Sequence, residues 1–441
     1  MLPLTVVAVC ACHGLLDVSD PTLVQDKDIA NVAGANARRL NVFVRFNGTA
    51  MNLANDVAIF TDEREMDLPG NYPFDQYVYL DQRNSEGYEA QFGQGFGTED
   101  PHLGGWDEIF TKASIALPAI RAYSPDSVRG DFLAQMHVIR AYAVLQVGED
   151  VCPGFPINDI VNNVPIYGLP FTNDSAFKFA IMQADSALAE VQDSTQFKYF
   201  AQVLKGRALL DLGRYQEVAS TIAGVPPTFT FVAQVGGDLG TNYFYIQHYY
   251  WDDVSGSQNE QMAVGNLEGR NGLPFAQFND PRVGAVFRQT RYSDPTDSLY
   301  DQNKYASPDD PMVLASGLEV QLMQAEVALN AGDVSGWLGI LNALRTTAIT
   351  PSLPQLADPG IDSARVSLLY SERAFWLYLT GHRLGDLRRM IRNYGRDPES
   401  IFPTGRYPLR GGNYGTATAI PFIQTSEQRY NPNITSGCTT R

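Results

Sequence analysis

The segment from position 371 to 389 interleaves charged residues with apolar ones, and four of these charged residues are Glu372, Arg373, Arg383 and Asp386. A buried guanidinium or carboxylate costs several kcal/mol unless it is paired. We therefore expect one apolar helix in which these residues have fixed partners inside the protein. Two kinds of chemistry fit such a set: an internal ion network that locks the last helices, or a clamp for a charged ligand. The cost of an unpaired buried charge favours the network.

Beyond this segment, the sequence lacks the common motifs of catalysis. It contains no Gly-x-Ser-x-Gly, no phosphate-binding loop ending in Gly-Lys-Ser/Thr and no His-Glu-x-x-His. Gly93, Gly95 and Gly97 do not form the dinucleotide-binding pattern, because Thr98 stands where its third glycine belongs. We therefore expect the segment from Gly93 to Gly97 to form a turning loop. For the chain as a whole we expect no cofactor and no enzyme activity. A carboxylate pair assembled by the fold is not visible in a sequence, so an all-helical glycoside hydrolase stays open as an alternative.

The spacing of histidines and aspartates does not indicate a metal site. The five histidines, at positions 13, 102, 137, 248 and 382, show no ligand spacing. Asp294, Asp297 and Asp301 carry the oxygen atoms that calcium prefers, but they lack the loop pattern that makes such a site specific. We expect a solvated acidic turn at these aspartates and no bound metal.

The cysteines divide into an N-terminal pair and a distant pair. Cys10 and Cys12 follow the first apolar residues, whereas Cys152 and Cys438 lie far apart in the remainder of the chain. In an oxidising compartment Cys152 and Cys438 can form a disulfide that closes a long loop. The alternative is two separate buried thiols. The sequence does not decide between the two, because it does not give the distance between the Cα atoms.

The start of the chain has the order of a bacterial lipoprotein signal. An apolar run from Leu2 to Val9 is followed by Cys10-Ala11-Cys12, which resembles a lipobox with Cys12 as the lipidated residue. The run is far shorter than the roughly 20 residues that span a bilayer, but it fits the apolar part of a secretion signal. We therefore expect a signal peptide over residues 1–11, truncated at its basic start, and a lipidated tether over residues 12–28. A buried or frayed N-terminal strand is the alternative.

Composition favours a compact globular protein that does not bind nucleic acid. The 441 residues are 44% hydrophobic and 18% charged, and no Gly/Ser-rich or highly charged linker divides them. We therefore expect residues 29–441 to form one unit. The net charge of −17 repels phosphate backbones, whose neutralisation by Lys and Arg supplies most of the affinity in nucleic-acid binding.

Helical periodicity recurs in separated blocks. Phe132, Met136, Ile139 and Ala143 form one apolar stripe, and a second stripe on the same helix indicates neighbours on two sides. Residues 212–215 resemble the turn of a tetratricopeptide repeat. We predict a mainly α fold with about four tetratricopeptide-like helix pairs and a second, irregular, loop-rich lobe. The predicted helical ranges are 29–60, 106–147, 175–222, 315–347 and 363–392, and the irregular ranges are 61–105, 226–311 and 393–441.

Two of the irregular ranges are rich in aromatic residues interleaved with amides and acids. Aromatic faces pack against the C–H faces of sugar rings, while amides and carboxylates bind hydroxyl groups, and the same residue types suit peptides. Any single ring is more often part of a protein core than of a ligand site, and we assign Trp106 to structure. The candidate ligand residues are Tyr72, Phe74, Tyr77, Tyr249, Tyr250 and Trp251.

Motifs along the chain share the pattern of one protein family. Residues 371–389 are followed by Ile420-Pro421-Phe422-Ile423 and by Asn431-Pro432-Asn433-Ile434, and earlier segments contain Asp280-Pro281-Arg282 and Ala325-Glu326-Val327. Together these motifs resemble the SusD/RagB family of outer-membrane nutrient-binding lipoproteins over almost the whole chain. One departure is Thr380, which stands where relatives commonly have Glu, so one usual partner in the ion network is missing.

The resemblance implies a function in nutrient binding at the cell surface. A protein of this family is anchored to the outer membrane by lipid and lies over a SusC-like TonB-dependent transporter. It binds an oligosaccharide or oligopeptide and delivers it to the transporter as a lid, and it breaks no bond. Two alternatives stay open from the residues: the secreted helical glycoside hydrolase, and a tetratricopeptide-type scaffold for protein partners.

Overall fold

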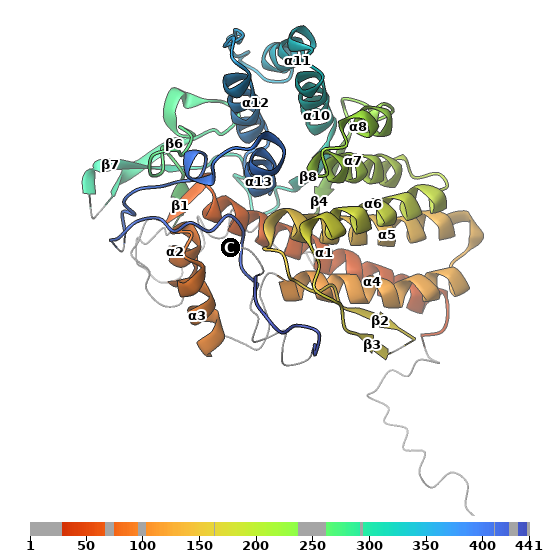
Figure 1. The fold of residues 1–441 in the computed structure, drawn as a ribbon. Coiled ribbons are helices and arrows are strands. Elements are labelled where there is room, and N and C mark those ends of the chain that lie inside the picture. The colour runs from red at the N-terminus through yellow and green to blue at the C-terminus, as the bar shows by residue number, and fades with distance from the viewer. Residues whose placement is uncertain are drawn as a thin grey trace, which may run out of the picture.

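The computed structural model describes residues 29–66, 75–95, 103–162, 164–236, 262–291, 294–409, 411–422 and 431–438. Within these ranges the fold is mainly α-helical, as predicted, and its strands pair two at a time. In Figure 1 the helices α4 to α8 lie on one side of the molecule, and α2, α3, β6 and β7 lie on the other.

The first three long helices form the base of the helical part. Helix α1 (Val32–Phe60) packs against α4 (Leu103–Tyr123), and α4 packs against α5 (Asp126–Asp150). Asn31 caps α1, because its side chain accepts a hydrogen bond from the amide of Gly34. These helices meet in an aromatic cluster in which the Tyr142 ring lies 5.4 Å from Phe46 and 5.7 Å from Trp106. Trp106 is buried there, which agrees with its assignment to structure.

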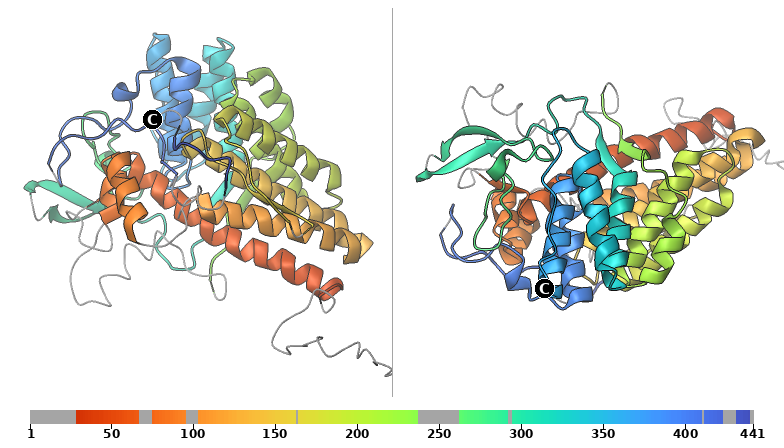
Figure 2. Two further views of the ribbon diagram at one scale, coloured as in Figure 1. Left: turned by 60° about the horizontal axis from the view of Figure 1, so that its bottom comes forward. Right: turned by 90° about the horizontal axis from the view of Figure 1, so that it is seen from above.

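The remaining helices continue the array. They are α6 (Asn173–Glu190), α7 (Thr195–Asp211), α8 (Tyr215–Ile222), α10 (Gly317–Asn330), α11 (Val334–Thr347), α12 (Asp362–Trp376) and α13 (Arg383–Tyr394). Helix α10 contacts α8, α11 and α12, so these elements form a continuous row. The right-hand view of Figure 2 shows this row, from green α7 and α8 through cyan α10 and α11 to blue α12 and α13.

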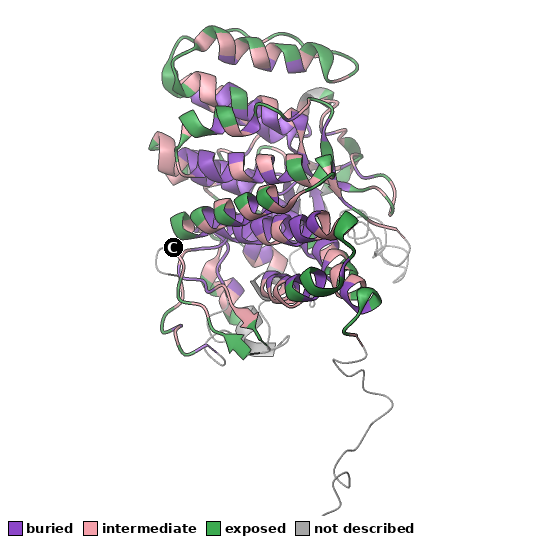
Figure 3. Cartoon of the chain, turned by 90° about the vertical axis from the view of Figure 1, so that its right-hand side faces the viewer, coloured by how far each residue is buried: buried purple, intermediate pink, exposed green. Residues whose placement is uncertain are grey.

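Short glycine turns connect helices within this row. Gly213 lies between α7 and α8 with φ of 68°, and Gly332 lies between α10 and α11 with φ of 77°. Both values belong to the left-handed region that glycine adopts at little cost. The exposed helices α8 and α11 then turn one apolar stripe inward, which in α11 consists of Trp337, Leu341 and Leu344. Figure 3 shows the result, with buried residues concentrated on the inner sides of the helices.

The segment predicted to be irregular between 61 and 105 contains two helices instead. These are α2 (Asp75–Asp81) and α3 (Ser85–Gly95), so the loop expected around Gly93 and Gly95 is wrong for these two residues. Asn84 starts α3 by accepting a hydrogen bond from the amide of Gly87. Val78, Leu80 and Tyr88 are buried in the core, and this tertiary packing outweighs the low helix propensity of the glycines.

The described residues also contain short antiparallel strand pairs. The pairs are β1 (Arg64–Met66) with β5 (Met262–Val264), β2 (Asp159–Val161) with β3 (Val164–Ile166), β4 (Thr230–Ala233) with β8 (Met312–Ser316), and β6 (Val286–Arg291) with β7 (Asp294–Asp301). Two short 3₁₀ helices, η3 (Gln277–Asn279) and η4 (Pro398–Ser400), complete the described elements. The range 226–311 therefore contains strands as well as loops.

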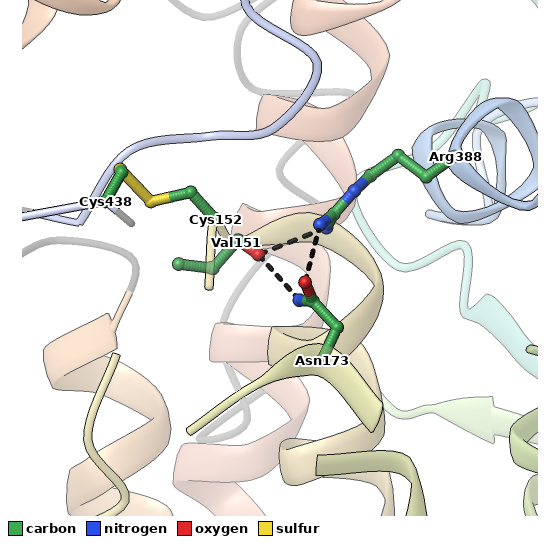
Figure 4. The surroundings of a disulfide bond; sticks show 5 residues. All are labelled: Val151, Cys152, Asn173, Arg388 and Cys438. Carbon is green, nitrogen blue, oxygen red and sulfur yellow. Dashed lines mark hydrogen bonds between the residues drawn. A yellow bond between two sulfur atoms is a disulfide. The ribbon is translucent and has the colours of Figure 1, made fainter. Parts of the chain in front are cut away.

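A disulfide fastens the end of the chain to the helical part. Cys152 follows α5 and is bonded to Cys438, with 5.5 Å between the two Cα atoms and a sequence separation of 286. Of the two alternatives that the sequence leaves open, the structure therefore has the bridge. Arg388 of α13 holds the same corner from the other side, because it donates to the carbonyl oxygen of Val151 (Figure 4). Arg388 also donates to the carbonyl oxygen of Glu149.

Removing the disulfide is expected to destabilise the protein. In the Cys152→Ala/Cys438→Ala variant the free energy of unfolding should fall by about 2–4 kcal/mol, because the unfolded chain loses a long covalent loop. Urea unfolding of the oxidised protein and of the variant measures the difference. The reducing agent dithiothreitol should lower the stability of the wild type to that of the variant and leave the variant unchanged. Equal stability of oxidised wild type and variant would contradict the prediction.

Candidate functional site

The four charged residues predicted to share one helix lie on two helices. Glu372 and Arg373 belong to the last turn of α12, whereas Arg383 and Asp386 belong to the first turn of α13. The prediction of a single helix is therefore wrong. The chain turns between the helices because Leu379 and Gly381 have φ values of 53° and 76°, which no α-helix accommodates.

The turn between the two helices is packed closely against α1. A Cβ atom on Gly381 would lie 3.2 Å from the Cβ of Ala54, so both the backbone angle and the space favour glycine. Thr380, where the resemblance to the family fails, makes contacts within the turn. Its hydroxyl donates a hydrogen bond to the carbonyl of Leu377 and lies 2.8 Å from Nδ1 of His382. Thr380 thus stabilises the turn, and through His382, whose Nε2 lies 3.3 Å from Glu319, it also lies next to the pair of Glu319 and Arg207.

Arg373 and Asp386 form a buried bidentate pair. The Nε and Nη2 atoms of Arg373 each lie 2.8 Å from a carboxylate oxygen of Asp386. The same carboxylate accepts a third bond, of 2.7 Å, from Arg389. Burial alone raises the pKa of Asp386, but the charges of Arg373 and Arg389 lower that pKa to about 2. Asp386 is therefore ionised at any physiological pH and holds α12 and α13 together.

Arg383 and Glu372 connect the last helices to the second lobe. Arg383 donates to both oxygens of Asp62, at 2.7 and 2.9 Å, and Asp62 also accepts from the amide of Leu273 at 2.8 Å. Glu372 accepts from Arg282, of the Asp-Pro-Arg motif, at 2.9 Å, and from Arg345 of α11 at 2.5 Å. Each of the four predicted residues thus has a partner, and most partners lie on another element.

Several members of the network were not among the predicted residues. Arg389 donates to Glu326 of α10 and to Asp211 of α7, and the hydroxyl of Tyr370 donates to Glu326 at 2.9 Å. A separate pair joins Arg207 of α7 to Glu319 of α10 at 2.8 Å. The signal that predicted the first four residues, a charge inside an apolar helix, also marks Glu326 within Ala325-Glu326-Val327. What a sequence does not give is which charge meets which.

Most of the aromatic residues predicted to contact ligand lie outside the described residues. This applies to Tyr72, Phe74, Tyr249, Tyr250 and Trp251, and also to the predicted lipidation site Cys12. Tyr77 is described: it lies on α2, is half-buried and packs against the core. The structure thus places Tyr77 in a packing position.

A cavity of about 280 Å³ lies between the start of α1, the end of α4 and the β2–β3 hairpin. Ile115, Pro118 and Ile160 give it an apolar floor, and Tyr123 offers an aromatic ring that is 39% exposed. Pro118 has no amide hydrogen, so the carbonyl of Ser114 on the same wall lacks its usual helical donor. The other described lining residues are Ala30, Arg38 and Asn162.

This cavity is the candidate ligand site within the described part of the chain. It combines an apolar surface, one aromatic ring and a few polar groups, which is the usual composition of a small-molecule site. Its residues come from three segments that are distant in the sequence, and no local motif links them. Sequence patterns therefore gave no signal for it.

Two other classes of site are absent from the described residues. No helix there is both long enough and apolar enough to cross a membrane. No group of three or more His, Cys, Asp or Glu side chains in the same residues is arranged to hold a metal ion.

Replacing Asp386 by Asn should be strongly destabilising. The variant leaves Arg373 and Arg389 facing a neutral amide in a buried site, and breaking a buried pair in this way costs about 3–5 kcal/mol. Thermal and urea unfolding measure the loss. The matched control is Asp358→Asn, which removes the exposed partner of Arg365 and should change stability little. Equal losses in the two variants would show that Asp386 has no special role.

Two other buried carboxyls, whose pKa values are raised, should make the protein less stable as the pH rises. Burial raises the pKa of Asp150 to about 7 and that of Glu63 to about 8. Both values lie above those of the unfolded chain, so the unfolded state releases protons first as the pH rises. The free energy of unfolding should therefore fall between pH 5 and pH 7, by on the order of 1 kcal/mol per pH unit.

Urea unfolding across this pH range measures the slope. The Asp150→Asn/Glu63→Gln variant should have a flatter slope than the wild type. The control Glu86→Gln, which changes an exposed residue of α3, should retain the wild-type slope. A wild-type slope that survives in the double variant would refute the assignment to these two carboxyls.

Comparisons with known proteins identify the fold through structure alone. No family profile and no curated protein sequence matches the chain. A SusD superfamily protein from Bacteroides thetaiotaomicron matches with a TM-score of 0.65 at 12% identity, over 93% of this chain and 100% of that one. A SusD superfamily protein from Bacteroides fragilis matches with a TM-score of 0.64 at 13% identity, over 92% and 99% of the two chains.

A further similar structure is a SusD-like carbohydrate binding protein from Bacteroides vulgatus. Its TM-score is 0.59 at 14% identity, and the match covers 92% of this chain and 97% of that one. The matches extend over both lobes of the molecule, since they include nearly the full length of every chain compared. The protein therefore has the SusD fold.

Proposed function

We propose that the protein is a lipid-anchored binding protein of the outer cell surface. It binds an oligosaccharide or oligopeptide nutrient and delivers it to a SusC-like TonB-dependent transporter, over which it acts as a lid. The observation that carries this proposal is the SusD fold over nearly the full length of the chain, shared with a protein described as a SusD-like carbohydrate binding protein.

Features of the chain itself support the same function. The sequence order at Cys12 suits a lipid anchor on an exported chain, and a disulfide between Cys152 and Cys438 suits an oxidising compartment. The ring-rich segments around Tyr72 and Trp251 provide the residue types that bind sugars. The 280 Å³ cavity beside Tyr123 adds a second place of the same chemical character.

The proposed mechanism is binding and delivery without bond cleavage. Within the described residues, the many buried carboxylates of the α12–α13 network are each held by arginine, which favours a structural role for them. The rigid network keeps the helical part fixed, and the segments that join its helices present the binding residues. Delivery then requires only that the bound ligand and the transporter face one another.

Binding to a glycan and oligopeptide array tests the proposal. The purified protein should bind a defined set of glycans or peptides, and mass spectrometry should find the ligand chemically unchanged after incubation. Trp251→Ala should weaken binding by about tenfold, which corresponds to roughly 1.4 kcal/mol. The control Phe287→Ala removes an exposed ring of β6 and should leave the affinity unchanged.

Other outcomes would replace this function. Cleavage of a polysaccharide would indicate a glycoside hydrolase. Capture of soluble protein partners, with neither glycan binding nor co-purification of an outer-membrane barrel, would indicate a protein-interaction scaffold.

A further inference from the structure

A second cavity, of about 130 Å³, lies where α12 and α13 meet the second lobe. Arg383 of α13 and Arg396, which follows α13, both line it, together with Ser371 of α12 and Asn271. None of its described lining residues is acidic. Two arginines without an acid in one small cavity are unexpected in a chain of net charge −17.

Arg383 offers one unused donor to this cavity. Its side chain is 4% exposed, and its Nε and Nη2 atoms are occupied by Asp62. No described residue accepts a hydrogen bond from the remaining nitrogen, Nη1, and Nη1 is not among the fully enclosed atoms. A guanidinium normally uses its donors in pairs on planar acceptors, so an idle Nη1 beside a cavity is a position for an acceptor.

Arg396 carries a charge that no described carboxylate neutralises. Its Nη2 donates to the hydroxyl of Ser367 and its Nη1 lies 3.5 Å from the carbonyl of Ser363, while Nε is buried without a hydrogen-bond partner. The acids nearest in sequence are engaged elsewhere. Asp397 accepts from the amide of Glu399, and Glu399 itself lies 3.4 Å from Arg83.

A hydroxyl group completes the set. No described residue hydrogen-bonds to the Ser371 hydroxyl, and Ser371 of α12 lines the same cavity as Arg383 and Arg396. The neighbouring Tyr370 hydroxyl is directed away, to Glu326 and Arg389, so only the ring of Tyr370 contributes to the wall. The cavity therefore presents donors from three residues, one of them an unneutralised cation.

We propose that this cavity binds a small oxyanion, such as sulfate, phosphate or the carboxylate of a larger acid. Guanidinium and hydroxyl donors form charge-assisted hydrogen bonds with such groups, which are about twice as strong as neutral ones. The volume of 130 Å³ suits a single acid group and excludes a whole oligosaccharide. The site is distinct from the candidate ligand cavity, and its existence does not depend on the proposed function.

Calorimetric titration with sodium sulfate tests the proposal, with sodium chloride at equal ionic strength as the reference. Sulfate should bind saturably with one site per chain and raise the melting temperature, and chloride should do neither. Glucuronate and glucose then distinguish the source of the anion. Competition by glucuronate and not by glucose assigns the site to the acid group of a sugar, whereas binding of sulfate alone assigns it to a free ion. Absence of saturable binding by sulfate, phosphate and glucuronate would overturn the proposal.

Two variants locate the binding. Arg396→Gln should weaken sulfate binding at least tenfold, and Ser371→Ala should weaken it severalfold, with circular dichroism confirming that each protein is folded. The matched control is Arg45→Gln, which removes one positive charge from the exposed face of α1. Its affinity for sulfate should stay within twofold of the wild type. An equal loss in Arg45→Gln and Arg396→Gln, or no loss in either Arg396→Gln or Ser371→Ala, would exclude this cavity as the site.

Discussion

The end of the helical row is built around charges that have been removed from water, and the surrounding fold depends on each of them meeting a partner of opposite sign. Asp386 accepts from Arg373 and Arg389, and Arg389 extends the contact to α10 and α7. An uncompensated buried charge costs far more than a lost surface pair. Movement of any one of these helices would therefore leave a buried charge on a neighbouring helix without its partner, at that cost in free energy. The network therefore fixes the positions of the helices relative to one another.

The same physics joins the two lobes. Arg383 reaches Asp62, which follows α1, and Glu372 reaches Arg282 in the second lobe. Both contacts are charged, buried and short, so separating the lobes would leave buried charges without their partners. The candidate ligand cavity lies elsewhere, between the start of α1 and the end of α4, and its lining combines apolar residues with Arg38, Ser114 and Asn162. A charged, buried junction and a separate cavity fit the proposed function of holding and presenting a ligand.

Much of the fold could be predicted from the sequence, because apolar periodicity and glycine turns are local signals. The helical blocks around Met136, Gly213 and Gly332 correspond to helices or turns in the structure. The break between Trp376 and Arg383 could not be predicted in this way, since it results from backbone angles and from close contact with Ala54. The partners of Arg389 were equally inaccessible, because they lie on helices far away in the sequence. The candidate cavity depends on a proline-interrupted helix meeting a hairpin, and only folding brings the two together.

The corner after α5 is fastened twice by unlike chemistry. The bond between Cys152 and Cys438 is covalent and can be broken by reduction. The hydrogen bonds from Arg388 to the carbonyls of Glu149 and Val151 are electrostatic and are not affected by reduction. Reduction of the disulfide therefore releases Cys438 from this corner, while the hydrogen bonds of Arg388 to the same corner do not depend on the redox state.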